Sequence, residues 1–340
     1  MWHFRPKTQS STRASIAIDG DHLAHVEYDP RTREVLRWGV DSVRGADAVG
    51  RLEALRALRL PADGLLMQLP LSAYQLLQIE RPAVPADELK AAARWRIKDL
   101  VDTHIDNITL DVMGVGDPAR GGSAHLFVVA AAQSAVEEAT RLASEAGLKL
   151  AVIDIQETAQ RHLQTAAARA QGLEERATAA LVVRDRQCLL TICAGEELYL
   201  ARRLDWDPML VGQIHAQAQA EAIELTDSVE SLDLNYEYSL RANPYDQVGD
   251  TPRLIVDLQR SFDVWERSQP ELPLAQLMIE VPEHRTDLCL HLARELGLRV
   301  VPLDERAALT GDVLAGASAE ERARCLPLLG TLLRTDPQQP

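Results

Sequence analysis

The sequence predicts an α/β protein made of two similar halves around a cleft, with a small α/β subdomain inserted in the first half. A run of three short strands occurs twice, about half a chain apart. The 340 residues are too many for a single hydrophobic core of ordinary size. Hydrophobic residues make up 46% of the chain, with only 17 prolines and 18 glycines, so it is expected to fold rather than stay disordered.

The repeated three-strand pattern is the main evidence for two halves. Its first copy comprises Ile16–Asp19, Leu23–Tyr28 and Glu34–Val40, and its second comprises Ala180–Val183, Cys188–Cys193 and Leu198–Ala201. Leu23 aligns with Cys188 and Tyr28 with Cys193 at one constant offset of 165 residues. Chance alignment of short apolar runs is the alternative, but a shared offset at both ends of a strand favours duplication.

The remaining elements follow from apolar spacing, Gly and Pro positions and helix-end signals. In the first half they are a helix over 46–60, a strand over 65–69, a strand over 75–80, a helix beginning at Asp87, strands over 105–112 and 126–131, a helix over 134–146, a strand over 150–155 and a helix over 157–170. In the second half they are helices over 207–222, 253–267, 286–296 and 319–333 and strands over 277–281 and 300–303.

These elements predict the domain organisation. Residues 1–12 form a flexible tail, 13–176 the first half with the inserted subdomain at about 71–150, and 177–340 the second half. The tail carries Trp2 and Phe4 among basic residues, a mixture that suits an anionic membrane surface, although a solvated tail is the favoured interpretation.

Charge and apolar runs restrict the functional class. The formal net charge of −15 argues against a nucleic-acid partner, because phosphate backbones require a concentrated basic surface. The longest apolar run, 126–132, is far shorter than a membrane span, and residues 1–13 lack the apolar middle of a secretion signal, so a cytoplasmic protein is expected. The four cysteines show no metal-binding spacing, and neither metal nor disulfide use is expected.

Several strings, in this order, resemble the actin-like PilM family of pilus-assembly proteins. They are the proline loop and helix Pro82–Ile97, the strands and helix starts in Val129–Gln133, Ala146–Leu150 and Val152–Glu157, the helix Leu258–Asp263 and the closing helix Cys325–Arg334. The strings are most similar to the family's MSHA-pilus member, MshI. The resemblance covers nearly the whole chain and implies an actin-like, ribonuclease H-like duplicated fold.

The resemblance also implies where nucleotide would bind, namely between the halves at the tips of the two strand repeats. At the first tip, Asp19-Gly20-Asp21-His22 is about two residues shorter than the family pattern, and Ala24 stands at the position of a lysine. At the second tip, Val183-Arg-Asp185-Arg-Gln187 departs from the family's Asp-x-Gly motif. On the adenine side, Pro282-Glu283-His284 replaces a run of glycines.

Asp19, Gly20 and Asp185 are therefore interpreted as remnants of a nucleotide site, and no cofactor is expected; ATP with Mg²⁺ is the alternative. Asp19 and Asp21 also suit the capping of a turn, and that interpretation is favoured over metal binding. His22 and His25 lie three apart on a strand and face opposite sides, so they do not form a ligand pair. With no nucleophile set, zinc signature or phosphate loop in the sequence, no catalytic residue is assigned.

The expected function is a scaffold without ATP hydrolysis. The resemblance implies a cytoplasmic protein, peripheral to the inner membrane, that binds the cytoplasmic tail of a single-span PilN/MshJ-like membrane protein in a pilus assembly platform. Gln75, Gln78 and Trp95 are the candidate partner contacts, although packing of Trp95 against a neighbouring element is slightly favoured. An active ATPase and a type II secretion component are the alternatives, the latter disfavoured by a C-terminal stretch without a membrane span. Homo-oligomer formation is left open.

Overall fold

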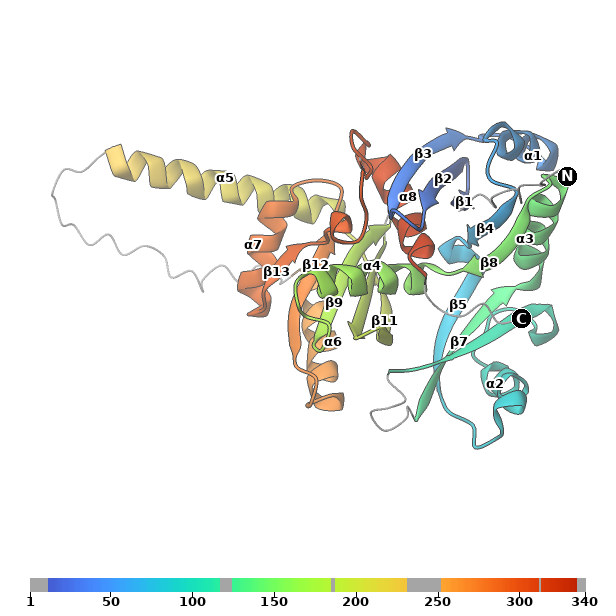
Figure 1. Ribbon diagram of the computed structural model, residues 1–340. Coiled ribbons are helices and arrows are strands. Elements are labelled where there is room, and N and C mark those ends of the chain that lie inside the picture. The colour runs from blue at the N-terminus through green and yellow to red at the C-terminus, as the bar shows by residue number, and fades with distance from the viewer. Residues whose placement is uncertain (1–11, 117–123, 185–186, 231–251, 312, 335–340) are drawn as a thin grey trace, which may run out of the picture. The chain divides into compact units, whose positions relative to one another are not determined.

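The computed structural model describes residues 12–116, 124–184, 187–230, 252–311 and 313–334 (Figure 1). The chain divides into two compact units. Unit 1 comprises 1–175, 191–201 and 304–340, and unit 2 comprises 176–190 and 202–303. Residues 304–340, which the sequence predicts to be part of the second half, are grouped with the first in the structure. The predicted tail over 1–12 lies outside the described residues except for Thr12.

Two five-stranded sheets of identical topology confirm the duplicated fold. Their strand orders are β3-β2-β1-β4-β8 and β11-β10-β9-β12-β13. The first sheet consists of β1 (Arg13–Asp19), β2 (His22–Asp29), β3 (Glu34–Ser42), β4 (Asp63–Gln68) and β8 (Lys149–Asp154). The second consists of β9 (Ala177–Arg184), β10 (Gln187–Ala194), β11 (Glu197–Asp205), β12 (Leu274–Glu280) and β13 (Val300–Pro302). Strands β2 and β10 are offset by 165 residues at both ends, as the repeat predicts.

Helices cover the first sheet with apolar side chains. Helices α1 (Ala48–Ala57) and α3 (Gln133–Glu145) contribute to one core with Ile16, Leu23 and Leu65 of the strands. Helix α8 (Ala319–Leu332) packs on β1, β2, β3 and β4 and on α4 (Gln156–Ala170). The α4–α8 contact is so close that a Cβ atom on Gly330 would lie 2.1 Å from the carbonyl oxygen of Ala159, which explains the glycine.

Helix α4 is buried although its sequence is polar. Its buried side chains include Gln156, Glu157, Gln160, Arg161 and Gln164. Such groups need hydrogen-bond partners, because an unpaired buried polar group is costly. Gln160 donates to Thr191 Oγ1 at 3.0 Å, and Thr191 donates to Gln164 Oε1 at 2.6 Å. The helix is therefore held in unit 1 by a hydrogen-bond network as well as by apolar packing.

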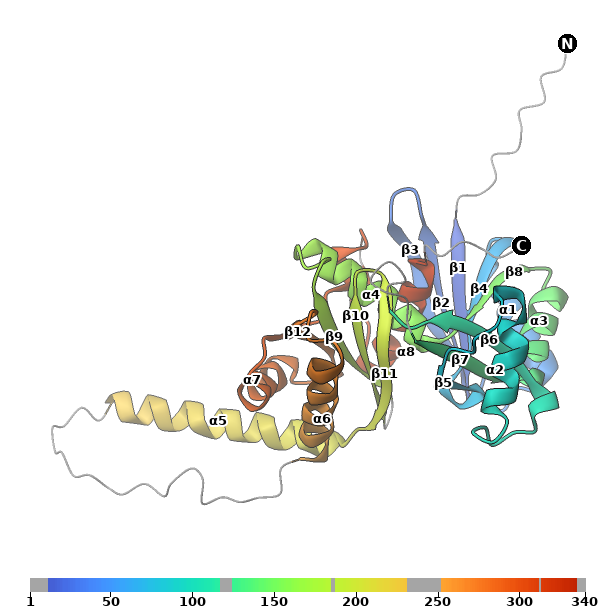
Figure 2. The same ribbon diagram turned by 90° about the horizontal axis from the view of Figure 1, so that it is seen from below.

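The inserted subdomain is a three-stranded sheet, β5-β7-β6, with a helix on one face (Figure 2). Its elements are β5 (Tyr74–Glu80), α2 (Leu89–Ile97), β6 (Ile108–Gly114) and β7 (His125–Ala132). Alternate residues of the strands, among them Ile79 and Val128, pack against Ala93 and Ile97 of α2. The opposite face packs through Phe127 against Cys193 and Leu198 of unit 1.

Unit 2 adds three helices to its part of the second sheet. They are α5 (Pro208–Glu230), α6 (Arg253–Ser268) and α7 (Arg285–Leu296). Apolar residues of α6 face the core, and Trp265 donates its indole N–H to the carbonyl oxygen of Leu272 at 3.0 Å. Helix α5 contacts α7 near its beginning, and both views show its later turns extending away from the other helices of the unit (Figures 1 and 2).

Candidate functional site

The polar residues of unit 1 gather where three parallel strands end. Strands β1, β4 and β8 run parallel, with Ala17 paired to Gln68 and Gln68 paired to Asp154. Asp19 follows Ala17 by two residues at the end of β1. Ligands of open α/β sheets bind beyond the carboxyl ends of parallel strands. A nucleotide contacted by Asp19 and Gly20 would therefore lie at this edge of the sheet.

The tip of the first hairpin is a minimal turn. Asp19 pairs with His22, which leaves only Gly20 and Asp21 as the loop, and Gly20 has a φ of 56°. Both Asp19 and Gly20 are exposed. The main-chain oxygen of Asp21 accepts from Val43 N–H at 2.7 Å, and its carboxylate lies 3.9 Å from the Arg44 guanidinium. A loop of two residues offers few main-chain N–H groups to a phosphate.

Side chains beside this tip are engaged within unit 1. Ala24, at the position of the family's lysine, is buried. His22 Nε2 lies 3.3 Å from the Glu320 carboxylate on α8. His25 is buried, with its Nδ1 3.6 Å from Asp41, and burial lowers the pKa of its imidazole despite that carboxylate. The two histidines thus occupy different surroundings.

A buried carboxyl group at the end of β8 was missed by the sequence analysis. Asp154 Oδ1 accepts from the Thr158 hydroxyl and from Ile155 N–H at 2.9 Å, and it lies 3.4 Å from Arg334 Nη1. Among the described residues Asp154 Oδ2 has no hydrogen-bond partner. Burial raises the pKa of this carboxyl group, and the hydrogen bonds and Arg334 only partly oppose the shift. The pattern Asp-x-x-x-Thr across a strand–helix junction was the available signal.

Gln68 beside it is also turned inward. Its amide donates to Thr331 Oγ1 at 3.2 Å and lies 3.5 Å from the carbonyl oxygen of Pro327, both on α8. Helix α8 therefore occupies the amide nitrogen of Gln68, and Arg334 just beyond it reaches Asp154. At this edge Asp19 is the exposed member, whereas Gln68 and Asp154 are nearly inaccessible.

The other predicted nucleotide residues lie in unit 2. Asp185 falls outside the described residues. The segment Pro282–His284 connects β12 to α7, and His284 has a φ of 48° in the left-handed region. Three side chains meet at this connection, His215 of α5, His284 before α7 and Asp287 in α7, and their distance along the chain hides the cluster in the sequence.

The three candidate partner residues do not share one surface. Gln75 lies on the side of β5 that faces α2, and its amide donates to Asp102 Oδ2 at 2.8 Å. Gln78 is exposed and, being three residues along the strand, points to the other side. Trp95 is 76% exposed on α2, with the Lys98 ammonium 5.8 Å from its ring centroid. The interpretation of Trp95 as a packed residue is wrong.

Strand β5 is an edge strand, and this gives its backbone a possible binding role. Arg81 N–H bonds the carbonyl oxygen of Ala124, so residues 75, 77 and 79 direct their main-chain groups toward β7. The main-chain groups of Leu76, Gln78 and Glu80 then point to the open edge of the sheet. A cavity of about 520 Å³ lies at the end of this strand, lined by the proline loop Arg81–Val84 and by Ala124 and His125.

Unit 2 carries a groove of about 650 Å³ between the end of β11 and helix α6. Its charged lining residues are Arg202, Arg203, Asp205, Arg253, Asp257, Arg260, Asp263 and Arg267. Arg253 lies 3.3 Å from Asp205 and 3.8 Å from Asp257, and Arg260 lies 4.0 Å from Asp257. Carboxylates therefore offset much of the positive charge, which weakens the groove as an anion site.

All four cysteines are free and buried. Burial raises the pKa of Cys188, Cys193 and Cys325 to about 12 and that of Cys289 to about 11. A thiol acts as a nucleophile or metal ligand in its thiolate form, which burial disfavours at all four positions.

No protein-family model matches the chain, and no curated protein matches its sequence. Its structure is similar to the PilM-PilN type IV pilus biogenesis complex, with a TM-score of 0.65 and 18% identity over 98% of this chain and 100% of that one. The cytoplasmic domain of EpsL, an inner-membrane component of the type II secretion system of Vibrio cholerae, matches 59% of this chain and 75% of its own, with 12% identity and a TM-score of 0.42.

An actin-like ATPase-fold protein from Bacteroides thetaiotaomicron matches 86% of this chain and 91% of its own, with 10% identity and a TM-score of 0.48. Within the described residues no helix combines the length and apolar character that crossing a bilayer requires. The two sheets of identical topology, together with the full-length similarity to the PilM-PilN complex, establish that the chain has the actin-like fold.

Proposed function

We propose that this chain is a cytoplasmic, actin-like scaffold of a type IV pilus assembly platform, of the MshI type. In this role it lies at the inner membrane and binds the cytoplasmic tail of a single-span PilN/MshJ-like protein without hydrolysing ATP. The observation that carries the proposal is the similarity to the PilM-PilN complex along the whole of both chains. The edge strand β5 and the exposed Trp95 supply surfaces suited to an extended segment.

The proposed mode of binding is addition of a strand to β5. An extended segment gains main-chain hydrogen bonds from the outward groups of Leu76, Gln78 and Glu80, and it gains apolar contacts from neighbouring pockets. The cavity beside the proline loop lies at one end of this edge and offers such a contact. Trp95 lies on α2, the helix that covers one face of the same sheet, and it is therefore a second, separate contact to test.

Binding is tested with the cytoplasmic segment of the single-span membrane protein encoded beside this chain, labelled and titrated with purified protein. Gln78→Pro removes one outward N–H while leaving the β5–β7 hydrogen bonds in place, because proline is tolerated on an edge strand. We expect this variant to weaken binding at least tenfold and to melt like the parent. Trp95→Ala tests the second contact, and Leu290→Ala, which removes an exposed apolar side chain from unit 2, is the control. Failure of the parent protein to bind the segment at micromolar concentration contradicts the proposal.

The absence of ATP hydrolysis is a separate part of the proposal. It is supported by the two-residue loop after Asp19 and by the buried Ala24 at the family's lysine position. A ligand that binds only the native state raises the melting temperature. We expect no shift with millimolar ATP and Mg²⁺ and no phosphate release. A shift that Asp19→Ala abolishes would instead support an ATP-binding protein.

A further inference from the structure

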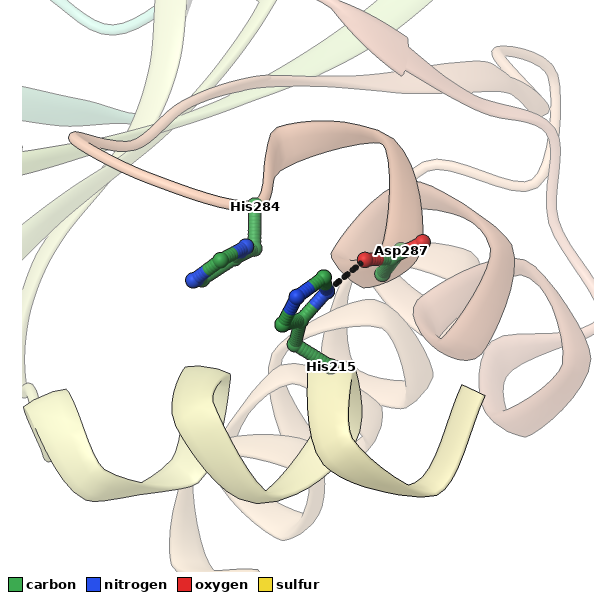
Figure 3. A group of neighbouring side chains, drawn as sticks. All are labelled: His215, His284 and Asp287. Carbon is green, nitrogen blue, oxygen red and sulfur yellow. Dashed lines mark hydrogen bonds and ion pairs between the residues drawn. The ribbon is translucent and has the colours of Figure 1, made fainter. Parts of the chain in front are cut away.

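The cluster His215, His284 and Asp287 brings together side chains from two helices of unit 2 (Figure 3). His215 lies on the second turn of α5, Asp287 in the first turn of α7, and His284 immediately before α7. Each side chain offers one nitrogen or carboxylate oxygen, and these three atoms lie within 4.8 Å of one another. His215 and Asp287 are half-buried, and His284 is exposed.

The hydrogen bonds of His215 orient its ring. Its Nδ1 lies 2.5 Å from Asp287 Oδ2, and its Nε2 lies 3.0 Å from the Gln219 amide nitrogen, one turn further along α5. A histidine that binds a metal through one ring nitrogen is usually held by a hydrogen bond at the other, and Gln219 lies beside Nε2 to supply it. The ring of His215 is thus held in place from both sides.

His284 has a backbone conformation that is unusual for its residue type. Among the described residues it is one of four non-glycine residues with positive φ, and it occupies the N-cap position of α7 without making a side-chain capping bond. Its ring stacks on that of His215, with centroids 3.7 Å apart and an interplanar angle of 18°. A left-handed backbone at a residue other than glycine costs free energy, and such residues gather at functional sites.

We propose that His215, His284 and Asp287 bind a divalent zinc ion that joins α5 to α7. Two imidazoles and one carboxylate are a ligand set that zinc uses, with a fourth position left for water. At bond lengths of about 2.0–2.2 Å, tetrahedral ligand atoms lie about 3.3 Å apart. To bind zinc, the distance between His215 Nδ1 and Asp287 Oδ2 must increase by less than an ångström, and zinc replaces the proton between these atoms. The exposed His284 ring must also rotate out of the stack.

The surroundings permit this rearrangement. When zinc binds His215 Nδ1, the proton of that ring resides on Nε2, which then donates to the oxygen of the Gln219 amide after the amide turns over. The positive end of the α7 dipole opposes a cation, and the Asp287 carboxylate offsets it. The consequence for the fold is that zinc would hold the part of α5 around His215 against α7, the helix with which α5 is in contact.

The test uses untagged, chelator-treated full-length protein titrated with ZnCl₂ in a calorimeter. We expect one zinc per chain with micromolar or tighter affinity. His215→Ala should weaken binding at least 100-fold, and Asp287→Asn at least tenfold. His284→Asn is the sharpest variant, because asparagine tolerates a left-handed backbone while lacking the imidazole, and it should also weaken binding at least tenfold. His104→Ala, which removes an exposed histidine of unit 1, should bind as the parent does.

A second readout follows the structure directly. Zinc should slow hydrogen exchange of α5 amides around His215 in the parent protein and not in His284→Asn. Cobalt used in place of zinc should give the intense visible absorption of a four-coordinate site. The proposal is overturned if the parent binds no zinc at micromolar concentration, or if His284→Asn binds zinc as tightly as the parent.

Discussion

Gln68 and Glu280 occupy equivalent places in the two duplicated sheets. Each is the last residue of the fourth strand, β4 in one sheet and β12 in the other, and each is buried. Gln68 is neutral and is satisfied by Thr331 Oγ1. Glu280 lies 3.0 Å from the guanidinium of Arg285. The duplicated backbone therefore keeps a buried polar side chain at this position while the chemistry differs: one copy uses a neutral hydrogen bond and the other an ion pair.

The largest effect is expected when the first sheet receives the charge of the second. Gln68→Glu places a carboxylate among hydrogen-bond acceptors of α8, and we expect it to lower the free energy of unfolding by about 3 kcal/mol at pH 7. Burial would raise the pKa of the new carboxyl group, so the native state would bind more protons than the unfolded state. Stability should then recover as the pH falls toward 4. Urea unfolding from pH 4 to 8 measures this, and a pH-independent loss contradicts the explanation.

The next test disturbs the packing of α8, the helix that contacts Gln68, against α4. Gly330→Ala brings a Cβ within 2.1 Å of the Ala159 carbonyl oxygen, so α8 must move away from α4. We expect a loss of about 2 kcal/mol, since overpacking a tight contact shifts backbone. The matched control is Gly212→Ala in α5, where a Cβ meets no atom within 4 Å and the better helix propensity of alanine should stabilise. Equal changes in the free energy of unfolding for the two variants would show that α8 can move away from α4 at little cost.

The ion pair of the second sheet provides the third test. Arg285→Ala leaves the buried Glu280 without this cation, and we expect a loss of about 2 kcal/mol, because Arg285 itself is partly exposed. Adding Glu280→Gln should restore part of the lost stability, as the glutamine imitates Gln68. A double-mutant cycle measured by thermal unfolding isolates the coupling between the two residues. Additive effects would mean that the pair contributes no coupling.

The smallest effect is expected at Asp154, the neighbour of Gln68. Burial raises the pKa of its carboxyl group above the ordinary value of 3.8, so its ionisation favours unfolding and stability declines as the pH rises through the raised pKa. Asp154→Asn should therefore increase stability modestly at pH 7, with the gain fading toward pH 3.8. Asp19→Asn, at the exposed end of β1, is the control and should have no such effect. A constant difference across pH would assign the effect to packing.

The sequence predicted the duplicated strands because alternation and turn residues act locally. The offset of 165 residues between β2 and β10 is visible without any structure. The same local signals place most helices within a few residues of their observed bounds. Helix α5 is longer than predicted, running to Glu230, because its polar residues carry no ending signal.

What the sequence could not show depends on contacts between distant segments. The burial of α4 is hidden by its polar composition, since Gln160 and Gln164 are satisfied by Thr191 about thirty residues away. The cluster of His215 with Asp287 joins residues 72 positions apart. The prediction for Trp95 is wrong because a large apolar side chain is normally packed, whereas this one is exposed.

Helix α8 has a consequence for how this protein folds during synthesis. The first sheet is covered by a helix whose residues, 319–332, are made after the whole of unit 2. At about 5–20 residues per second, roughly 8–30 s pass between completion of α4 and completion of α8. Throughout that interval the α8 side of the first sheet is uncovered, whereas unit 2 has all its elements once residue 303 is made, before synthesis of α8 begins. The later-made unit is therefore expected to mature first, reversing the usual order of folding along a chain.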